Sequence, residues 1–345
     1  MPVVWNSNHA LHDPGGEVWV GVRIPGTEVG ARLDRILAAV ADAGAEPVGA
    51  PQFGTEILHT VHTPDLTEFL STAWQAWDEW GYTTEPGVDR VVPYVFALPD
   101  VAPPNAIARS PAARAGRHAM DTMTLIGPGT WEAALGAASA AAHAADLVGS
   151  GTPAVYAAVR PPGHHVGTSF YGGSCYLNNA AVAAARLAAT GATVAVVDID
   201  AHHGNGTQQI FWDRTAVRYG SVHVDPGAGW FPHYAGYADE TGSGGSNRNI
   251  PLAPGTSDET WLEAVAALAA FGSGADALVV SLGVDAAAGD PESPLEITPD
   301  GYSTAGRILG DLRLPAVIVQ EGGYDLDTIG QLVVAFLTGY EGADR

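Results

Sequence analysis

The residues best suited to metal chemistry stand in one stretch, Val194 to Gly206, which reads VAVVDIDAHHGNG. Its apolar first half predicts a buried strand, and Asp198, Asp200 and His202 follow at every second position. Because alternate residues of an extended chain point to the same side, these three side chains should share one face. Carboxylates and an imidazole are ligands of zinc, and three protein ligands with an open fourth position are typical of catalytic zinc sites.

One more carboxylate would complete such a site, and Asp285 is well placed at the end of another predicted strand. The alternative is that Asp200 and His202 form a hydrogen-bonded pair without a metal. A two-metal site fits less well, because the next acid after Asp285 is Asp290. His203 faces the other way on an extended chain, so we assign it to structure.

Two adjacent histidines could supply acid–base chemistry. His164 and His165 follow a PPG run, which holds a loop in a fixed path. Neutral imidazoles beside a metal could take a proton from water and return it, and Asp198 could orient one of them. The alternative for the pair is local capping or hydrogen bonding in the core. Tyr324, in an EGGY sequence, carries a hydroxyl that could hydrogen-bond a forming oxyanion.

The remaining sequence predicts the elements that must position these residues. Predicted strands cover residues 3–5 (a short edge strand), 154–159, 194–199, 217–224, 277–282 and 316–319. Predicted helices cover residues 29–43, 66–80, 131–148, 178–189, 258–271, 299–309 and 328–337. In the first helix, periodicity places Arg32 off the apolar face, and a Gly- and Pro-rich loop is expected from Val224 to Pro254. Alternating strands and helices predict an α/β fold, with an open, mainly parallel sheet covered by helices on both faces.

Ligands of such sheets bind beyond the carboxyl ends of the strands. Five predicted strands are followed directly by polar or ionisable residues, in RPPGHH, DAHHGNG, HVDPG, the Asp285 loop and EGGYD. The candidate residues should therefore meet at one edge of the sheet.

Residues 81–129 break this pattern. The segment is rich in proline, has little periodicity and is too long for an ordinary connection. Its apolar VVPYVFALP run is unlike a solvated linker, so we predict a functional excursion such as a lid or an oligomer arm; the alternative is a mobile segment. We find no interdomain linker and predict a single domain over residues 1–345 with this long insertion.

Composition limits the partners. The formal net charge is −23, and all 15 cationic residues are arginine, which argues against nucleic acid and weakly favours cationic ligands. Cys175 is the only cysteine, so no intramolecular disulfide can form. We find neither a signal peptide nor a stretch apolar enough to span a bilayer. These features predict a cytoplasmic protein that does not bind membranes.

With these residues assembled, the chain resembles the histone deacetylase superfamily, and within it the bacterial acetylpolyamine amidohydrolases. The motifs RPPGHH, DIDAHHGNGTQ, SLGVDAAAGDP and EGGY stand in the order of that family, and the resemblance covers essentially the whole chain. It implies an arginase/deacetylase-like fold and one Zn²⁺ per chain. The resemblance assigns the metal to Asp200, His202 and Asp285.

The resemblance also implies roles for the other residues. His164 and His165 would be the tandem base and acid, with Asp198 behind His164, and Tyr324 would be the electrophilic hydroxyl. A structural K⁺ would lie near Asp198, Asp200, His202 and Ser221, partly on backbone carbonyls. Asn205 stands where class I deacetylases have an aspartate behind the second histidine, as is common in the class II and amidohydrolase branches.

Substrate-binding positions follow from the same comparison. Gly173 and Ser174 would face Phe231 across the acyl tunnel, and Ser174 replaces the aromatic residue usual there. Glu292 stands where a polyamine-selective member has a gatekeeper glutamate. Residues 81–129 match the insertion that narrows the mouth and builds a dimer in the amidohydrolases. An acid that helps to hold polyamines in that branch is replaced by Met123.

The expected reaction is removal of an acetyl group from small N-acetylated amines, polyamines above all. A protein acetyl-lysine deacetylase with the same chemistry remains an alternative, although a narrowed mouth argues against bulky substrates. A third reading is a catalytically silent, metal-bound binding module, against which the intact His164, His165 and Tyr324 speak. The single-metal ligand set disfavours an arginase-like ureohydrolase. Zn²⁺ and Fe²⁺ both remain open as the native metal.

Overall fold

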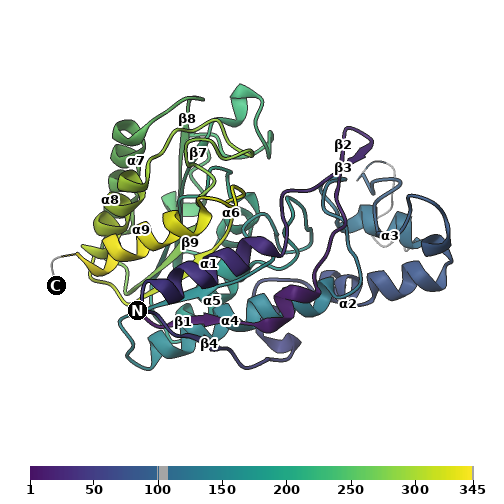
Figure 1. Ribbon diagram of the computed structural model, residues 1–345, viewed down its shortest axis with the longest axis horizontal. Helices are drawn as coiled ribbons and strands as arrows, with labels where there is room; N and C mark the ends of the chain where they lie inside the picture. Colours follow the sequence, from purple (N-terminus) through teal and green to yellow (C-terminus); the bar gives the residue numbers. More distant parts are fainter. Residues whose placement is uncertain (99, 101–107, 344–345) are drawn as a thin grey trace.

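The structure, a computed structural model, describes residues 1–98, 100 and 108–343. Eight parallel strands form a central sheet in the order β4-β1-β5-β10-β9-β6-β7-β8 (Figure 1). The strands are β1 (Val3–Trp5), β4 (Pro47–Gly49), β5 (Ala154–Ala158), β6 (Val194–Asp198), β7 (Val217–Val224), β8 (Asn247–Leu252), β9 (Ala277–Leu282) and β10 (Ala316–Gln320). The inner strands are buried apolar runs, as expected for a parallel sheet with both faces covered.

Helices cover both faces of this sheet (Figure 1). Alternate residues of β6 belong to different cores: Val194 and Val196 to one, Ala195 and Val197 to the other. The first core includes α4 (Thr130–Gly149) and α5 (Asn179–Ala188), and the second includes α1 (Ala31–Asp42), α7 (Asp258–Gly272), α8 (Pro299–Gly310) and α9 (Ile329–Glu341). The predicted α/β class with helices on both faces is therefore confirmed.

Four short elements differ from the sequence prediction. The first strand is not at an edge, because β4 pairs with its outer side. The edge strand β8 lies inside the segment expected to be a loop, and α6 (Asn205–Phe211) follows the metal-binding motif. An antiparallel hairpin, β2 (Glu17–Trp19) and β3 (Val22–Ile24), precedes α1. All four are short, and β8 reads NRNIPL, so none shows a long apolar period.

The predicted insertion, residues 81–129, contains its own helix. Its residues 99 and 101–107 lie outside the described part of the chain. In the described part, Val91 pairs with Ile126, and α3 (Pro111–His118) packs against α2 (Pro64–Glu79). Directly after α3, the backbone N–H of Met120 donates to the carbonyl of Tyr171 at 2.9 Å, so the insertion reaches the loop that precedes Gly173.

In the residues that the structure describes, no helix combines the length and apolarity needed to cross a membrane.

Candidate active site

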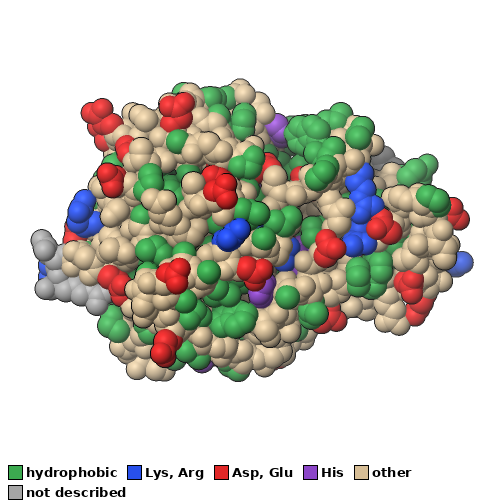
Figure 2. All heavy atoms as spheres, viewed as in Figure 1, with side chains coloured by type: hydrophobic (Ala, Val, Ile, Leu, Met, Phe, Trp, Pro, Cys, Tyr) green, Lys and Arg blue, Asp and Glu red, His purple; other side chains and the backbone are tan. Residues whose placement is uncertain are grey.

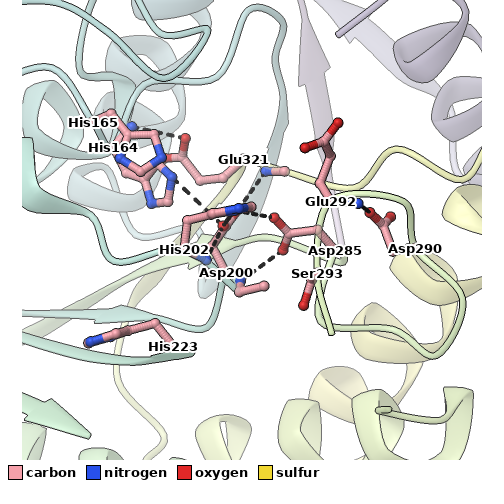
Figure 3. A network of polar contacts seen from close by, with 12 residues as sticks. His164, His165, Asp200, His202, His223, Asp285, Asp290, Glu292, Ser293 and Glu321 are labelled. Atoms are coloured by element: carbon pink, nitrogen blue, oxygen red, sulfur yellow. Dashed lines mark hydrogen bonds and ion pairs between the residues drawn. The ribbon is translucent and has the colours of Figure 1, made fainter. Parts of the chain in front are cut away.

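Three predicted ligands converge beyond the carboxyl ends of β6 and β9. Asp200, His202 and Asp285 each offer a ligand atom, and these atoms lie within 4.8 Å of one another (Figure 3). Nδ1 of His202 is 3.0 Å from Oδ2 of Asp285 and 3.3 Å from Oδ1 of Asp200. The chain bends after β6, where the Asp200 carboxylate accepts the backbone N–H of His202 at 2.9 Å, and Asp200 and His202 still meet.

The surroundings of this triad fit a divalent cation. Burial, together with the charge of Asp200, raises the pKa of Asp285 to about 7, so two buried carboxylates repel each other. A cation bound between them would remove that repulsion. A Cβ atom at Gly322 would lie 2.5 Å from an oxygen of each aspartate, and one at Gly283 would lie 2.1 Å from Asp200. Glycine at both positions leaves the space that the ligand set needs.

The tandem histidines lie beside the triad. Their ring centroids are 4.1 Å apart, and both side chains are almost fully buried. Nδ1 of His164 lies 3.0 Å from Asp198, as predicted, and Nδ1 of His165 lies 2.8 Å from Oδ1 of Asn205. Since a carboxylate and an amide oxygen only accept, both Nδ1 atoms carry the proton, which leaves each Nε2 atom as the reactive nitrogen.

Burial and neighbouring charges together shift the pKa values of the two histidines in opposite directions. Burial opposes protonation of His164, but the carboxylates of Asp200 and Asp198 outweigh it and raise its pKa to about 10. A divalent cation on Asp200 would offset part of that effect. Burial lowers the pKa of His165 well below 6.5, and the neighbouring His164 and His202 lower it further. His165 is therefore the neutral partner and suits a general base.

Tyr324 lines a cavity together with His165 and His202. Two buried side chains, Asp290 and Arg32, hold it in position. Its backbone N–H donates to Oδ2 of Asp290 at 2.7 Å. The guanidinium carbon of Arg32 lies 4.6 Å from the Tyr324 ring centroid, and Arg32 donates to the carbonyls of Glu321 and Gly323. Burial raises the pKa of Tyr324 well above 10, while the Arg32 charge opposes the rise. The hydroxyl therefore stays protonated and can donate.

The predicted exposure of Arg32 is wrong. Periodicity placed it off the apolar face of the first helix, yet it is 2% exposed. Oε1 of Glu28 accepts Nη1 of Arg32 at 2.9 Å, and Glu28 also binds Arg160, at the start of RPPGHH, through both carboxylate oxygens. A guanidinium with these partners can be buried without leaving an unpaired charge. The Glu28 partner is only four residues away, but helical periodicity does not reveal that Arg160 and the carbonyls of Glu321 and Gly323, which are distant in the sequence, complete this buried cluster.

The residues predicted near potassium also lie together. Ser221 stands opposite Asp198 in the register of β6 and β7. The Ser221 hydroxyl contacts Nδ1 of His223 at 2.8 Å. His203 lies outside the metal triad: its Nε2 contacts Gln208 at 3.1 Å and its ring packs 4.7 Å from His223, which agrees with a structural role.

A cavity of about 390 Å³ opens above the histidines. It brings together the predicted Gly173, Ser174, Phe231 and Glu292 with His165, His202 and Tyr324. Sequence reasoning did not identify other lining residues, namely Glu17, Trp19, Ile24, Thr27, Gly229, Trp230, His233 and Pro291. One sequence feature could have indicated the hairpin that carries Glu17 and Trp19: β-branched residues flank Gly21 in EVWVGVRI, which is typical of two short strands joined by a turn.

Gly173 packs closely against two other residues of the cavity lining, His165 and Phe231. A Cβ atom on Gly173 would lie 2.3 Å from the His165 ring and 3.0 Å from Phe231. Asp121, in the insertion, accepts the backbone N–H of Gly173 at 2.6 Å. Next to it, Ser174 has a φ of 59°, a left-handed conformation that is uncommon for serine. The insertion therefore holds one wall of the cavity.

Two carboxylates stand at the mouth of this cavity. Thr27 joins them, because its backbone N–H donates to Glu17 at 3.3 Å and its hydroxyl donates to Glu292 at 2.7 Å. Burial, and then the charge of Glu292, raises the pKa of Glu17 to about 7. Among the described residues, no arginine or histidine forms an ion pair with either carboxylate.

An open parallel sheet with a carboxylate–histidine metal triad, tandem histidines and a tyrosine defines a metal-dependent amide hydrolase. Comparisons agree: residues 27–340 match the model of the histone deacetylase domain. The chain belongs to the histone deacetylase family, and it is a deacetylase.

The relatives cover the chain almost completely. It is 41% identical over 351 residues to the acetylpolyamine amidohydrolase of Mycoplana ramosa, covering 99% of this chain and 100% of that protein. The crystal structure of an acetylpolyamine aminohydrolase from Burkholderia pseudomallei superposes with a TM-score of 0.91 at 38% identity and covers 99% of both chains. The HD domain of HDA15 superposes with a TM-score of 0.79 at 31% identity, over 99% of this chain and 91% of that one.

Two variants separate metal binding from the chemistry beside it. Asp285→Asn should bind zinc much more weakly, since it removes one of three charged or imidazole ligands. Tyr324→Phe should keep its metal but lower kcat by about 10²-fold, the scale of a lost oxyanion donor. Metal analysis of the purified proteins and turnover of an acetylated amine provide the two readouts. Tyr171→Phe, which loses a buried hydroxyl outside the cavity, is the control; near-normal turnover in Tyr324→Phe would contradict the role of Tyr324.

Proposed function

We propose that this deacetylase removes the acetyl group from small N-acetylated amines that carry a second ammonium group, such as acetylpolyamines. The observation that carries the proposal is the pair of carboxylates, Glu17 and Glu292, at the mouth of the catalytic cavity. An acetyl-amide at the histidines and an ammonium at the mouth would use both ends of this cavity. Relatives that share about 40% identity are named acetylpolyamine amidohydrolases, which supports the same substrate class.

Zn²⁺ is the metal that we propose for Asp200, His202 and Asp285, one ion per chain. Two carboxylates and an imidazole are a mixed oxygen and nitrogen set that suits zinc, and the fourth position would face the cavity. Zinc bound there would polarise the acetyl carbonyl and make water more acidic. The structural K⁺ is proposed for the neighbouring group of Asp198, Asp200, His202 and Ser221, partly on backbone carbonyls.

The chain's own residues would move the protons. Nε2 of His165 faces the cavity without a proton and would accept one from water as the water oxygen bonds to the acetyl carbon. The Tyr324 hydroxyl would donate a hydrogen bond to the carbonyl oxygen as negative charge develops on it. The histidine pair would then deliver a proton to the amine nitrogen as the C–N bond breaks. The products are acetate and the free amine.

We also propose that the chain forms a homodimer through the insertion. The insertion and the hairpin expose large apolar side chains: Tyr94 is 84% exposed and Val20 is 83% exposed. Figure 2 shows hydrophobic side chains gathered over the hairpin, which itself lines the cavity. Large exposed apolar side chains of this kind are typical of an interface between protein chains.

Sedimentation equilibrium should give twice the chain mass of 35.5 kDa for the wild-type protein. Combining Tyr94→Asp with Val20→Asp should shift the protein to monomer, because each buries a charge in the interface. Val48→Asp, at a 57% exposed position on β4, is the matched control and should leave the dimer intact. A wild-type monomer at micromolar concentration would contradict the dimer.

A substrate panel tests the function directly. Acetylated putrescine, cadaverine and spermidine should show a kcat/KM at least about 10-fold above an acetylated monoamine of equal length, the scale of one partly buried charge pair. An acetyl-lysine peptide should be a poorer substrate, because it lacks the second ammonium group that Glu17 and Glu292 would bind. Equal or better turnover of the peptide would favour a protein deacetylase instead. Stoichiometric zinc without turnover of any acylated amine would favour a binding module.

The Glu17 carboxylate should make diamine binding depend on pH. Its raised pKa means that the charge is present above about pH 7 and lost as the pH falls through 7. The inhibition constant of a free diamine product should therefore rise by about 5-fold between pH 8 and pH 6, whereas that of a monoamine should not. Glu17→Gln should bind the diamine weakly at both values. An unchanged pH dependence in this variant would remove Glu17 from amine recognition.

A further inference from the structure

Glu321 is a buried carboxylate that the chemistry above does not use. It directly follows β10, and it is 0% exposed. One of its oxygens, Oε2, accepts the backbone N–H of Gly163 at 2.7 Å and that of His164 at 3.1 Å. A single carboxylate oxygen therefore binds the backbone from which both histidines project (Figure 3).

The same residue is also linked to Tyr324. The Glu321 carbonyl accepts Nη2 of Arg32 at 2.7 Å, and the Arg32 guanidinium lies beneath the Tyr324 ring. The side chain of Glu321 thus holds the histidine loop, while its backbone is held next to the tyrosine loop. Glu321 is therefore connected to both loops that carry the catalytic side chains.

The histidine loop is confined on its other side by backbone. A Cβ atom on Gly163 would lie 2.5 Å from the backbone nitrogen of Asn179 and 2.6 Å from the carbonyl oxygen of Leu177. The side-chain amide of Asn179 also donates to the carbonyl of Pro161 at 3.1 Å. The loop is therefore clamped between the start of α5 and the Glu321 carboxylate.

Stability alone does not explain a carboxylate in this place. Its second oxygen, Oε1, is buried and has no hydrogen-bond partner among the described residues. Burial raises the pKa of Glu321 to about 7, which reflects the free energy needed to keep the charge there. An unpaired buried oxygen destabilises a fold, so an advantage in catalysis would account for it better.

We propose that Glu321 is a positioning residue for deacetylation: its carboxylate fixes the backbone of Gly163 and His164, and so aligns both histidines with the Tyr324 hydroxyl. Glu321 does not contact the substrate. The proposal rests on the deacetylation chemistry of the proposed function and not on the identity of the amine.

The kinetic test compares two substitutions at one position. Glu321→Ala removes both hydrogen bonds and should lower kcat by about 10²-fold, the effect of a displacement of about 1 Å in catalytic groups, with KM and zinc content unchanged. Glu321→Gln keeps an oxygen acceptor and should retain most of the activity. Tyr156→Phe, which removes a buried hydroxyl bound to Gln320 at 2.7 Å, controls for loss of a buried polar group beside the same strand.

Hydrogen exchange gives a second readout that needs no turnover. The amides of Gly163 and His164 should exchange faster in Glu321→Ala and should be protected in the wild-type protein and in Glu321→Gln. Unchanged exchange in Glu321→Ala would overturn the proposal, as would faster exchange with an unchanged kcat. Equal losses of activity and melting temperature in both variants would also overturn it. If the wild-type protein deacetylated no amine, the proposed function would fail, while the exchange data would still decide whether Glu321 anchors the loop.

Discussion

The repulsion between two buried carboxylates is the constraint on which the rest of this structure depends. Because β6 and β9 are hydrogen-bonded neighbours, Asp200 and Asp285 meet where both strands end. Burial and the charge of Asp200 raise the pKa of Asp285 to about 7, so the pair is unstable without nearby positive charge. Backbone amides relieve part of the repulsion: the N–H of Gly322 donates to Asp200 at 2.7 Å, and that of Ala201 donates to Asp285 at 2.8 Å. His164 and His202 supply further compensation, and a cation bound between the two carboxylates would remove the rest of the repulsion.

A second buried cluster of charged side chains, Glu28, Arg32 and Arg160, contacts both loops that carry catalytic residues. Glu28 binds Arg160, the first residue of the RPPGHH motif that carries the histidines. It also binds Arg32, whose guanidinium lies against the Tyr324 ring. A buried ion pair of this kind is weak grounds for expecting extra stability, but it restricts the positions of the groups that it joins. Together with Glu321, this cluster connects the loop of His164 and His165 with the loop of Tyr324. The acid–base pair and the oxyanion donor are thereby held in fixed relation, as a site preorganised for a transition state requires.

Local patterns revealed the parts of this protein whose structure is set by neighbouring residues. The motifs at strand ends predicted Asp200, His202 and Asp285 together, because strand geometry alone brings them to one edge. Long-range pairing was not visible: Arg32 has the period of an exposed residue, and its partners are carbonyls almost 300 positions away. The strand β8 escaped prediction because Asn249 is polar; its buried Nδ2 donates to Oε1 of Gln208, which lies 41 residues earlier. The hairpin of β2 and β3 was not predicted, because its strands are only three residues long, and no local pattern could indicate that Glu17 lines the cavity.

The distribution of positive charge connects the fold with the substrate. This chain has few cations for its 38 acidic residues, and it buries two arginines, Arg32 and Arg160, against a single carboxylate. In the described part of the chain, none of the residues that line the cavity is an arginine. Among the described residues, Glu17 and Glu292 therefore have the hydrogen bonds from Thr27 but no cationic partner, in the cavity that a ligand would enter. A cationic amine that supplied the missing charge would gain affinity from groups that the fold leaves uncompensated, whereas a neutral amide would have to displace their water without that gain.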